Sequence, residues 1–392
     1  MSLLFRKRTT TLADAGAPGR ASAGGAVRVT PDSALASSAV WACLRLRADL
    51  VSTMPIDTYR KVNFDGETVQ VEVPKPPVLI DTGGASVGVM EFLYSTEFDL
   101  DRSGNTVGII TARDGAGRPA RIDLVPLADA YGRGVGSEIV EWRIGKKLYD
   151  PVDIWHEKQF TVSGFPFGLS PIMHAAKSLG SYLSAQEFAL AWFANDVAPS
   201  GTLKHSSEEN ISTKVADTMK ERFKVAVSQR DIFVTGSEWE YTPASLDAAQ
   251  AAFIEERKFG LADVARYLGV PADLIDVEGS SASITYANIT QRNLQFLVMN
   301  LGPAIARREA ALSKLLAAPR FVKFNTDALL RMDPAAVVAS MKVEIDSRTL
   351  TVSEARALRN RAPLTDAQIA EFDRLFPQKA AAPVTPTIGA PA

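Results

Sequence analysis

Apolar positions recur at helical spacing near the start of the chain and then give way to short strand-like runs. Pro55 marks the change, because it turns the chain into a strand predicted over 56–61. The helix predicted over 37–51 has the apolar positions Val40, Leu44, Ala48 and Val51. Further short strands, separated by glycine-containing turns, are predicted over 107–112, 122–127 and 139–144. We therefore expect the first part of the fold to be rich in antiparallel β-structure.

Helical patterning dominates after Ser170-Pro171, where a serine cap and a proline at the first helical position begin a long helix. Later elements are predicted as helices over 208–228, 245–268 and 286–316, with a strand over 232–235. Gly269 and Pro271 should end the second of these helices, and Gly302-Pro303 should break the third. The whole pattern predicts an α+β fold in which a β-rich N-terminal lobe precedes mainly helical regions.

The bulk composition excludes several classes of protein. The length of 392 residues predicts two or three lobes, and 46% hydrophobic with 22% charged residues is typical of a globular chain. A formal net charge of −2 provides no global field to gather phosphate backbones. The single cysteine, Cys43, excludes an internal disulfide and is expected to be buried.

Both ends of the chain have the composition of flexible tails, over 1–30 and 377–392. The N-terminal residues contain no apolar stretch of the length that a signal peptide needs. The densest apolar run, residues 188–194, is too short for a membrane helix. We therefore expect no membrane contact and a protein made and used in the cytoplasm.

Two segments of the sequence resemble metal-binding motifs, but each lacks a required residue. His156-Glu157 begins like a zinc-protease motif, but Phe160 stands where the second histidine is needed. Residues 99–104 open like a calcium loop, but the twelfth position is Ile110, so the segment is interpreted as a solvated turn. We expect no metal site.

Phosphate-binding and nucleophile motifs are also incomplete. The alternating glycines lack the strand and helix of a dinucleotide fingerprint and are interpreted as a flexible loop; they are Gly132, Gly134 and Gly136. No P-loop is present, and Ser170 is better explained as a helix cap than as a nucleophile. The sequence therefore predicts no catalytic residue and no cofactor.

One helix face is polar but nearly uncharged. Its residues lie at offsets of three, four and seven, and they are Asn288, Gln291, Arg292 and Gln295. Another face of the same helix is apolar and consists of Leu294, Leu297, Val298 and Leu301. The polar face is either an ordinary solvated surface or a surface that slides past phosphates through weak hydrogen bonds, without the lysine contacts that would hold DNA in place.

Several stretches, in the expected order, resemble the portal (head-to-tail connector) proteins of long-tailed phages of the siphophage type. The most specific are Gly168-Leu169-Ser170-Pro171, Phe193-Ala194-Asn195 and Pro199-Ser200-Gly201. A second group comprises Glu256-Arg257-Lys258-Phe259, Val264-Ala265-Arg266, Gly269-Val270-Pro271, Tyr286, Asn288 and Asn293. Residues 38–45, 54–60 and 104–119 resemble the family's first helix, first strand and β-rich segment, from which Thr106 departs. The resemblance covers roughly residues 35 to 365.

The resemblance implies a dodecameric ring at one vertex of the capsid, with double-stranded DNA passing through an axial channel during packaging and ejection. The implied partners are other copies of the chain, the major capsid protein, the terminase large subunit and the head–tail adaptor protein that replaces terminase. The implied location is the portal vertex of the virion, after assembly in the host cytoplasm. Such a ring buries two different faces of each subunit.

By position, the resemblance divides the chain into seven regions. They are a flexible tail (1–30), a wing-like α+β region (31–245), a stem helix (246–268), a clip-like loop (269–283), second stem and channel helices (284–318), a C-terminal wing and crown region (319–376) and a flexible Pro/Ala tail (377–392). The polar face from Asn288 to Gln295 then becomes the candidate DNA channel surface. The candidate docking residues for terminase or adaptor, Asp273, Asp276 and Glu278, lie on the clip-like loop, although a solvated loop explains them equally well.

Two other classes of function remain open at this point. One is another virion structural protein, an adaptor or a minor capsid protein, although adaptor chains are generally shorter. The other is a metal-dependent nucleic-acid enzyme that would use Asp99 and Asp101.

Overall fold

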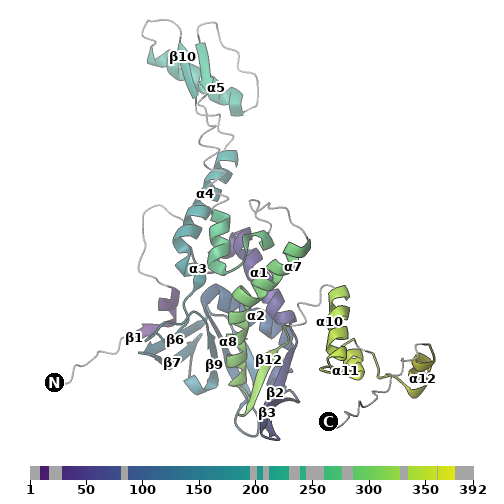
Figure 1. Cartoon of the computed structure of the whole chain (residues 1–392). Helices are drawn as coiled ribbons and strands as arrows, with labels where there is room; N and C mark the ends of the chain where they lie inside the picture. The colour runs from purple at the N-terminus through teal and green to yellow at the C-terminus, as the bar shows by residue number, and fades with distance from the viewer. Residues whose placement is uncertain are drawn as a thin grey trace, which may run out of the picture. The chain divides into compact units, whose positions relative to one another are not determined.

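The chain divides into two compact units, Met1–Thr326 and Asp327–Ala392. The computed structural model describes residues 9–16, 29–80, 87–194, 201–205, 212–228, 239–243, 260–275, 286–326, 334–359 and 361–375 (Figure 1). None of the helices within these ranges is long and apolar enough to cross a membrane.

The first unit contains four small sheets, and every strand pairing among the described residues is antiparallel. The strands are β1 (Thr9–Thr11), β2 (Ile56–Phe64), β3 (Glu67–Val73), β4 (Asn105–Arg113), β5 (Pro119–Val125), β6 (Ala130–Val135), β7 (Glu138–Ile144), β8 (Lys147–Tyr149), β9 (Ile154–Lys158), β10 (Gly201–His205), β11 (Trp239–Pro243) and β12 (Arg320–Phe324). Their orders are β1-β6-β7-β8, β5-β4-β9, β12-β2-β3 and β10-β11. Because Phe324 pairs with Ile56, the end of the first unit returns to its beginning.

Helices make up much of the remainder, so the α+β prediction is confirmed. The α-helices are α1 (Ser38–Thr53), α2 (Val89–Ser103), α3 (Pro171–His174), α4 (Ala176–Ala194), α5 (Thr213–Ser228), α7 (Tyr286–Gln295), α8 (Gly302–Ser313), α10 (Pro334–Asp346), α11 (Val352–Ala357) and α12 (Asp366–Leu375). Shorter turns are η1 (Leu12–Gly16), η2 (Ser33–Ala36), η3 (Pro77–Leu79), η4 (Pro151–Asp153) and η5 (Ala272–Ile275), while η6 (Phe296–Leu301) is a π-helical segment. Residues 260–268 are also helical.

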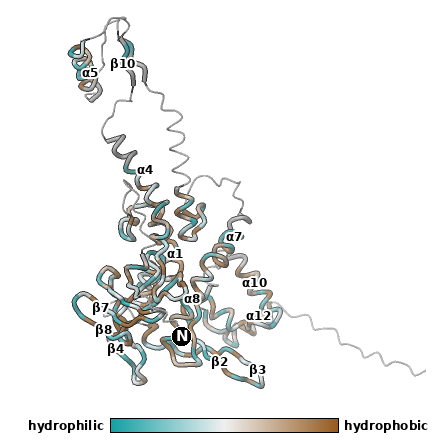
Figure 2. Tube along the Cα trace, turned by 90° about the vertical axis from the view of Figure 1, so that its left-hand side faces the viewer, coloured by the Kyte–Doolittle hydropathy of each residue, from teal (hydrophilic) through white to brown (hydrophobic). Residues whose placement is uncertain are grey.

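The main apolar core joins α1 to the helices that follow the sheets. Ser37 caps α1 by accepting a hydrogen bond from the Val40 amide, and Cys43 is fully buried, as predicted. The core also takes side chains from α3, α4, residues 260–268 and η6; examples are Ile172, Leu179, Val264 and Phe296. Such apolar positions are brown in Figure 2. On α1 the pattern at helical spacing therefore marks the true core face, since Val40, Leu44, Ala48 and Val51 are all buried.

Part of the predicted N-terminal tail is folded. β1 pairs with β6, and Ala15 of η1 packs into a second apolar core with Trp142 and Phe167. The pairing forms because β6 is a strand rather than the flexible loop that its glycines suggested. Side chains of Trp142, Pro166 and Phe167 lie against Gly132 and Gly134, where a larger residue would collide with them.

Two predicted helix boundaries are confirmed. Ser170 caps α3 by accepting from the Met173 amide, so the residue is a cap as expected. The helix over 260–268 ends at Gly269, which takes a left-handed φ of +66°, and the next amide, of Val270, donates to the Ala265 carbonyl. This arrangement is a Schellman cap, which strongly favours glycine.

Asn105 connects two stretches that lie far apart in sequence. Its Nδ2 donates to the Gly168 carbonyl (2.8 Å) and its Oδ1 accepts from the Gly168 amide (2.8 Å), while the Ser170 hydroxyl donates to the Arg102 carbonyl (2.8 Å). Gly104 has a left-handed φ of +72°, and a side chain there would collide with the Leu169 carbonyl. The end of α2 is therefore fixed against the segment that begins α3.

Asn105→Ala should destabilise the first unit. The substitution leaves the buried amide and carbonyl of Gly168 without partners, and each such group costs about 1–3 kcal/mol. We expect the free energy of unfolding, measured with urea, to fall by roughly 2–4 kcal/mol. The control is Asn63→Ala on β2, where the side chain is exposed and little change is expected. Equal effects of the two substitutions would contradict the role given to Asn105.

Candidate functional site

The candidate site is built on one continuous helical rod formed by α7, η6 and α8. Gly302 has helical dihedral angles (φ −54°, ψ −45°), and its amide donates to the Leu297 carbonyl five residues earlier. The expected break at Gly302-Pro303 is therefore wrong. Pro303 has no amide hydrogen, so inside an α-helix it would leave one carbonyl without a hydrogen-bond donor. Here the π-helical segment ends at Leu301, and Pro303 lies in the first turn of α8, where a proline is tolerated.

The π-helical segment also divides the apolar face that the sequence predicted. Leu297 and Leu301 are buried, whereas Leu294 and Val298 are 46% and 58% exposed. A π-turn holds more residues than an α-turn, so residues that would form one α-helical stripe do not stay on one face. The rod thus presents apolar side chains to its surroundings in addition to its polar face.

The predicted polar face lies on α7, with Gln291 and Gln295 exposed. Asn288 belongs to the same helix, but its side chain lies outside the described residues. Arg292 forms an ion pair with Asp273, in which the Arg292 guanidinium donates to the Asp273 carboxylate at 2.7 Å. The structure therefore joins a candidate channel residue to a candidate docking residue.

This ion pair changes what both residues can do. The charge of Arg292 is compensated within the chain, so this arginine does not add a free cation to the exposed amides. Asp273 lies on η5 and its carboxylate is occupied by Arg292. The other two candidate docking residues, Asp276 and Glu278, lie outside the described residues.

α8 is anchored by Arg308, whose side chain is fully buried. The Arg308 guanidinium donates to the Glu157 carboxylate of β9 at 2.9 Å and to the Thr96 hydroxyl of α2 at 2.6 Å. It also lies 3.5 Å from the Glu97 carboxylate. One arginine thus connects α8 to a sheet and to another helix.

A second buried arginine completes the cluster. Arg47 of α1 forms two hydrogen bonds with the Asp101 carboxylate, at 2.6 and 3.0 Å, and lies 3.7 Å from Glu97. We use the name polar core for Arg47, Glu97, Asp101, Glu157 and Arg308. Its two guanidinium groups face three carboxyl groups, and neither oxygen of Glu97 has a hydrogen-bond partner in the described part of the chain.

Glu97 is the carboxyl group that fits this environment least well as an anion. Burial, together with the negative charges of Asp101 and Glu157, raises the pKa of Glu97 to about 7, although both arginines oppose the shift. Protonation of Glu97 leaves two cations balanced by two anions. The polar core is therefore closest to neutrality when Glu97 holds a proton.

The geometry does not support the metal-dependent enzyme that the sequence left open. Asp99 and Asp101 lie on α2 rather than in a calcium loop or a solvated turn, because Phe92, Leu93 and Leu100 of this helix pack inward. Asp101 is bound by Arg47, and the Asp99 carboxylate accepts from Arg102 at 3.0 Å. Within the described residues, no three His, Cys, Asp or Glu side chains are grouped so that they could hold a metal ion.

His156-Glu157 lies on β9, where neighbouring side chains point to opposite faces, and not on a helix. His156 Nε2 lies 3.0 Å from Asn105 Oδ1. Because that oxygen also accepts from the Gly168 amide, Nε2 must be the donor. Burial lowers the pKa of His156 to about 3, with Lys158 as a second cause, so the ring is neutral. These residues serve internal hydrogen bonding and not zinc binding.

Sequence reasoning missed the polar core. Arg308 and Glu157 are separated by 151 positions, so no local pattern reveals their contact. One indication of the polar core is present in the sequence of α1, where Arg47 lies on the same buried stripe as Leu44 and Val51. A charged residue on an apolar stripe predicts a buried partner of opposite charge but cannot name it.

The comparisons with known proteins agree with one another. A family model described as phage portal protein matches residues 38–360. The portal protein of Enterobacteria phage HK97 is 28% identical over 349 residues, which cover 85% of this chain and 80% of that protein. The probable portal protein of Streptomyces phage phiC31 is 26% identical over 371 residues, covering 86% and 77%.

Solved structures share the fold. An HK97 family phage portal protein from Corynebacterium diphtheriae matches with a TM-score of 0.57 at 20% identity, covering 80% of this chain and all of that one. A chain from the neck of a native gene transfer agent particle, computed with C12 symmetry, matches with a TM-score of 0.57 at 19% identity, covering 88% and 97%.

Glu97→Gln should change how stability depends on pH. Because the pKa of Glu97 is raised from 4.5 to about 7, the folded chain binds the proton more tightly than the unfolded chain. The tighter binding of this proton therefore adds to the free energy of unfolding. The added stability is fully present below about pH 4.5 and is lost as the pH rises to about 7. The amide introduced by the substitution cannot lose a proton, so the variant should gain stability relative to the parent across this window, by roughly 1–3 kcal/mol at about pH 8.

The measurement is urea unfolding at fixed protein concentration between about pH 5 and 8, the range over which the carboxyl group should lose its proton. Glu67→Gln, on β3 with its side chain in solvent, is the matched control and should follow the parent. Parallel pH profiles for Glu97→Gln and the parent would show that Glu97 does not hold the extra proton.

Proposed function

Because this chain belongs to the phage portal protein family, we propose that it assembles into a closed ring at one capsid vertex and forms the channel for packaging and ejection of double-stranded DNA. The chain is a phage portal protein and thus a structural component of the virion at its portal and neck. The family match over residues 38–360 carries the proposal, since it includes most of the sheets, the polar core and the whole helical rod.

Ring assembly is supported by what the single chain leaves exposed. Leu294 and Val298 lie on the rod with much of their apolar surface in solvent. A neighbouring copy in a head-to-tail ring would cover such surface, because a heterologous contact buries two different faces of each subunit. The C12 symmetry of the similar gene transfer agent neck supports a dodecamer.

The proposed channel surface is the exposed amide face of α7. Gln291 and Gln295 offer weak, uncharged hydrogen bonds, and Arg292 is compensated by Asp273. Such a surface would not displace the counterions of DNA and would therefore not hold the duplex in place. We include Asn288 in the proposed channel surface only because of its position on α7.

The proposed partners follow from the portal role. We propose that the terminase large subunit and then the head–tail adaptor dock on the clip-like loop, and that the major capsid protein surrounds the ring. Asp273 is occupied by Arg292, so Asp276 and Glu278 are the remaining acidic candidates for docking. An acidic loop fits a basic partner surface.

We propose the division of the chain into seven regions as stated above. The strand pairing of β12 bears on the C-terminal wing and crown region, residues 319–376. β12 pairs with β2, so residues 320–324 belong with the N-terminal sheets. The compact unit that follows begins at residue 327. We therefore propose that the crown comes from this second unit.

Replacing both exposed amides by lysine should make the channel bind DNA. Gln291→Lys/Gln295→Lys adds two cations per copy, and we expect DNA affinity to rise by at least roughly tenfold near about 100 mM salt, with a steeper salt dependence. The measurement is binding of short duplex DNA to purified rings, verified by microscopy, over a range of salt concentrations. Packaging efficiency should fall in the same variant.

The control, Thr68→Lys/Gln70→Lys, places the same charge on exposed positions of β3. If both variants gained the same affinity, or if neither did, Gln291 and Gln295 would not line the channel.

A further inference from the structure

The second unit contains an apolar groove between α10 and α11. The groove has a volume of about 420 Å³. Its apolar lining consists of Val338, Met341 and Ile345 from α10 with Val352 and Ala355 from α11. Val338 and Val352 remain about half exposed, so the groove is not filled by its own walls.

The rim of the groove is mainly basic. Arg356, Arg359 and Arg361 line the side formed by the end of α11 and the residues after it, and Lys342 lines the α10 side with one acid, Asp346. Arg356 also donates to the Ala362 carbonyl at 2.7 Å, which holds the following segment at the end of α11. An occupant should therefore combine an apolar stripe with acidic residues beside it.

α12 has this combination and is exposed along its whole length. Its apolar stripe consists of Ile369, Phe372 and Leu375, each about half exposed. Asp366 and Asp373 lie beside the stripe on the helix surface. Thr365 and Gln368 fix the start of the helix by mutual hydrogen bonds. A helix of ten residues is marginal in water by itself, so α12 needs a surface on which to dock.

We propose that α12 of one copy docks in the α10–α11 groove of a neighbouring copy. The stripe with Phe372 fills the apolar groove, and Asp366 and Asp373 meet the arginine rim. The groove and the helix are different surfaces of the same unit, which is what a head-to-tail contact between identical chains requires. Exchange of such an element is a low-cost route to association. The inference rests on the proposed ring, although the family match ends at residue 360, before α12.

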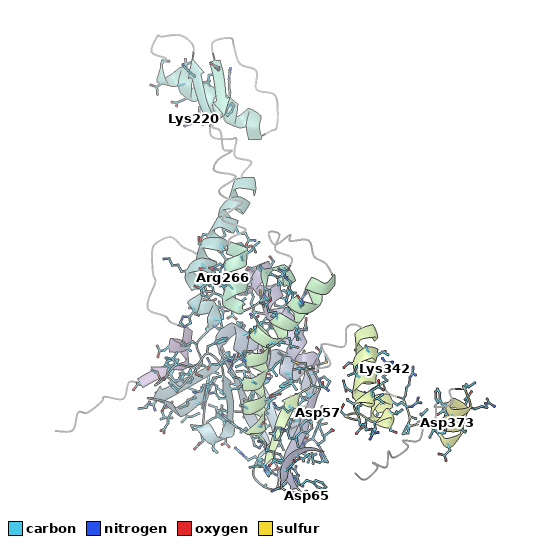
Figure 3. All side chains as sticks on the ribbon, in the orientation of Figure 1. Asp57, Asp65, Lys220, Arg266, Lys342 and Asp373 are labelled. Carbon is cyan, nitrogen blue, oxygen red and sulfur yellow. The ribbon has the colours of Figure 1, made fainter. Side chains whose placement is uncertain are left out.

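The two halves of the contact are separate in a single chain. Lys342 beside the groove and Asp373 on α12 are labelled in Figure 3. In the described part of the chain, α12 leaves its own groove open, because all ten of its residues are exposed. Docking on a second copy therefore needs no displacement of an existing internal contact.

Cross-linking between two single-cysteine variants tests the proposal directly. Met341→Cys and Phe372→Cys are produced as separate full-length chains and co-assembled; the native Cys43 is fully buried and does not compete. Mild oxidation of the mixture should give a covalent dimer containing one chain of each kind, while either variant alone should stay monomeric on a denaturing gel. The pair Ile345→Cys and Ile369→Cys provides a second test if the first pair folds poorly.

Matched controls use the opposite faces of the same helices. Ser340→Cys on α10 and Ala367→Cys on α12 lie away from the groove and from the stripe, and their mixture should give no dimer. Asp373→Arg should lower the yield of the Met341–Phe372 link several-fold, and adding Arg359→Asp should restore it.

The outcomes separate this inference from the ring itself. Rings seen by microscopy without a mixed covalent dimer would overturn the docking of α12 and leave the portal proposal intact. A chain that carries both cysteines and links only within itself would show that α12 occupies its own groove, which also overturns the inference. Absence of rings would count against the proposed function. In that case the presence of the mixed covalent dimer would still support the docking of α12, and its absence would overturn it.

Discussion

The polar core is the constraint on which the rest of the first unit depends. It places two guanidinium groups and three carboxyl groups among α1, α2, α8 and β9, where water does not reach them. Removing charges from water is costly, and the cost is offset only if the partners keep their geometry. Because Arg308 must meet both Glu157 and Thr96, α8 has one position against the sheet and α2. We infer that the cluster fixes orientation more than it adds stability.

That orientation determines what the rod presents to other molecules. With Arg308 held inside, the π-helical segment directs Leu297 and Leu301 to the core and leaves Leu294, Val298 and the amides of α7 outside. Mixed apolar and uncharged polar surface suits a chain that packs beside copies of itself around DNA. The Asp273–Arg292 ion pair also keeps this surface nearly uncharged, because Asp273 compensates the positive charge of Arg292. In the proposed channel, such a surface would guide DNA without holding it.

Elements defined by local patterns were predictable from the sequence, and contacts between distant segments were not. α1, the Ser170 cap and the Gly269 stop depend on neighbouring residues and were confirmed. The segment that forms α2 supports two interpretations, because Phe92, Leu93 and Leu100 have helical spacing while Asp99 and Asp101 match the opening of a calcium loop. The alternating glycines of β6 favour a loop, because no local pattern indicates that Trp142 and Phe167 pack against them. The π-helical segment Phe296–Leu301 has no local sequence pattern by which it could be recognised.

The candidate site shows the same division. Amide residues of α7 were predicted on one polar face, and Gln291 and Gln295 are exposed. The pairing of Arg292 with Asp273 could not be predicted, because the two residues are 19 positions apart and meet only where η5 lies beside α7.

Electron microscopy of the purified full-length chain, at a resolution that shows helices, can test ring assembly and the orientation of α7 together. We expect closed rings with a central hole, in which Gln291 and Gln295 of α7 face the hole and Arg308 lies away from it inside each copy. A compact monomer at high concentration would rule out the proposed ring, and a ring with α7 on its outer surface would rule out the proposed channel surface.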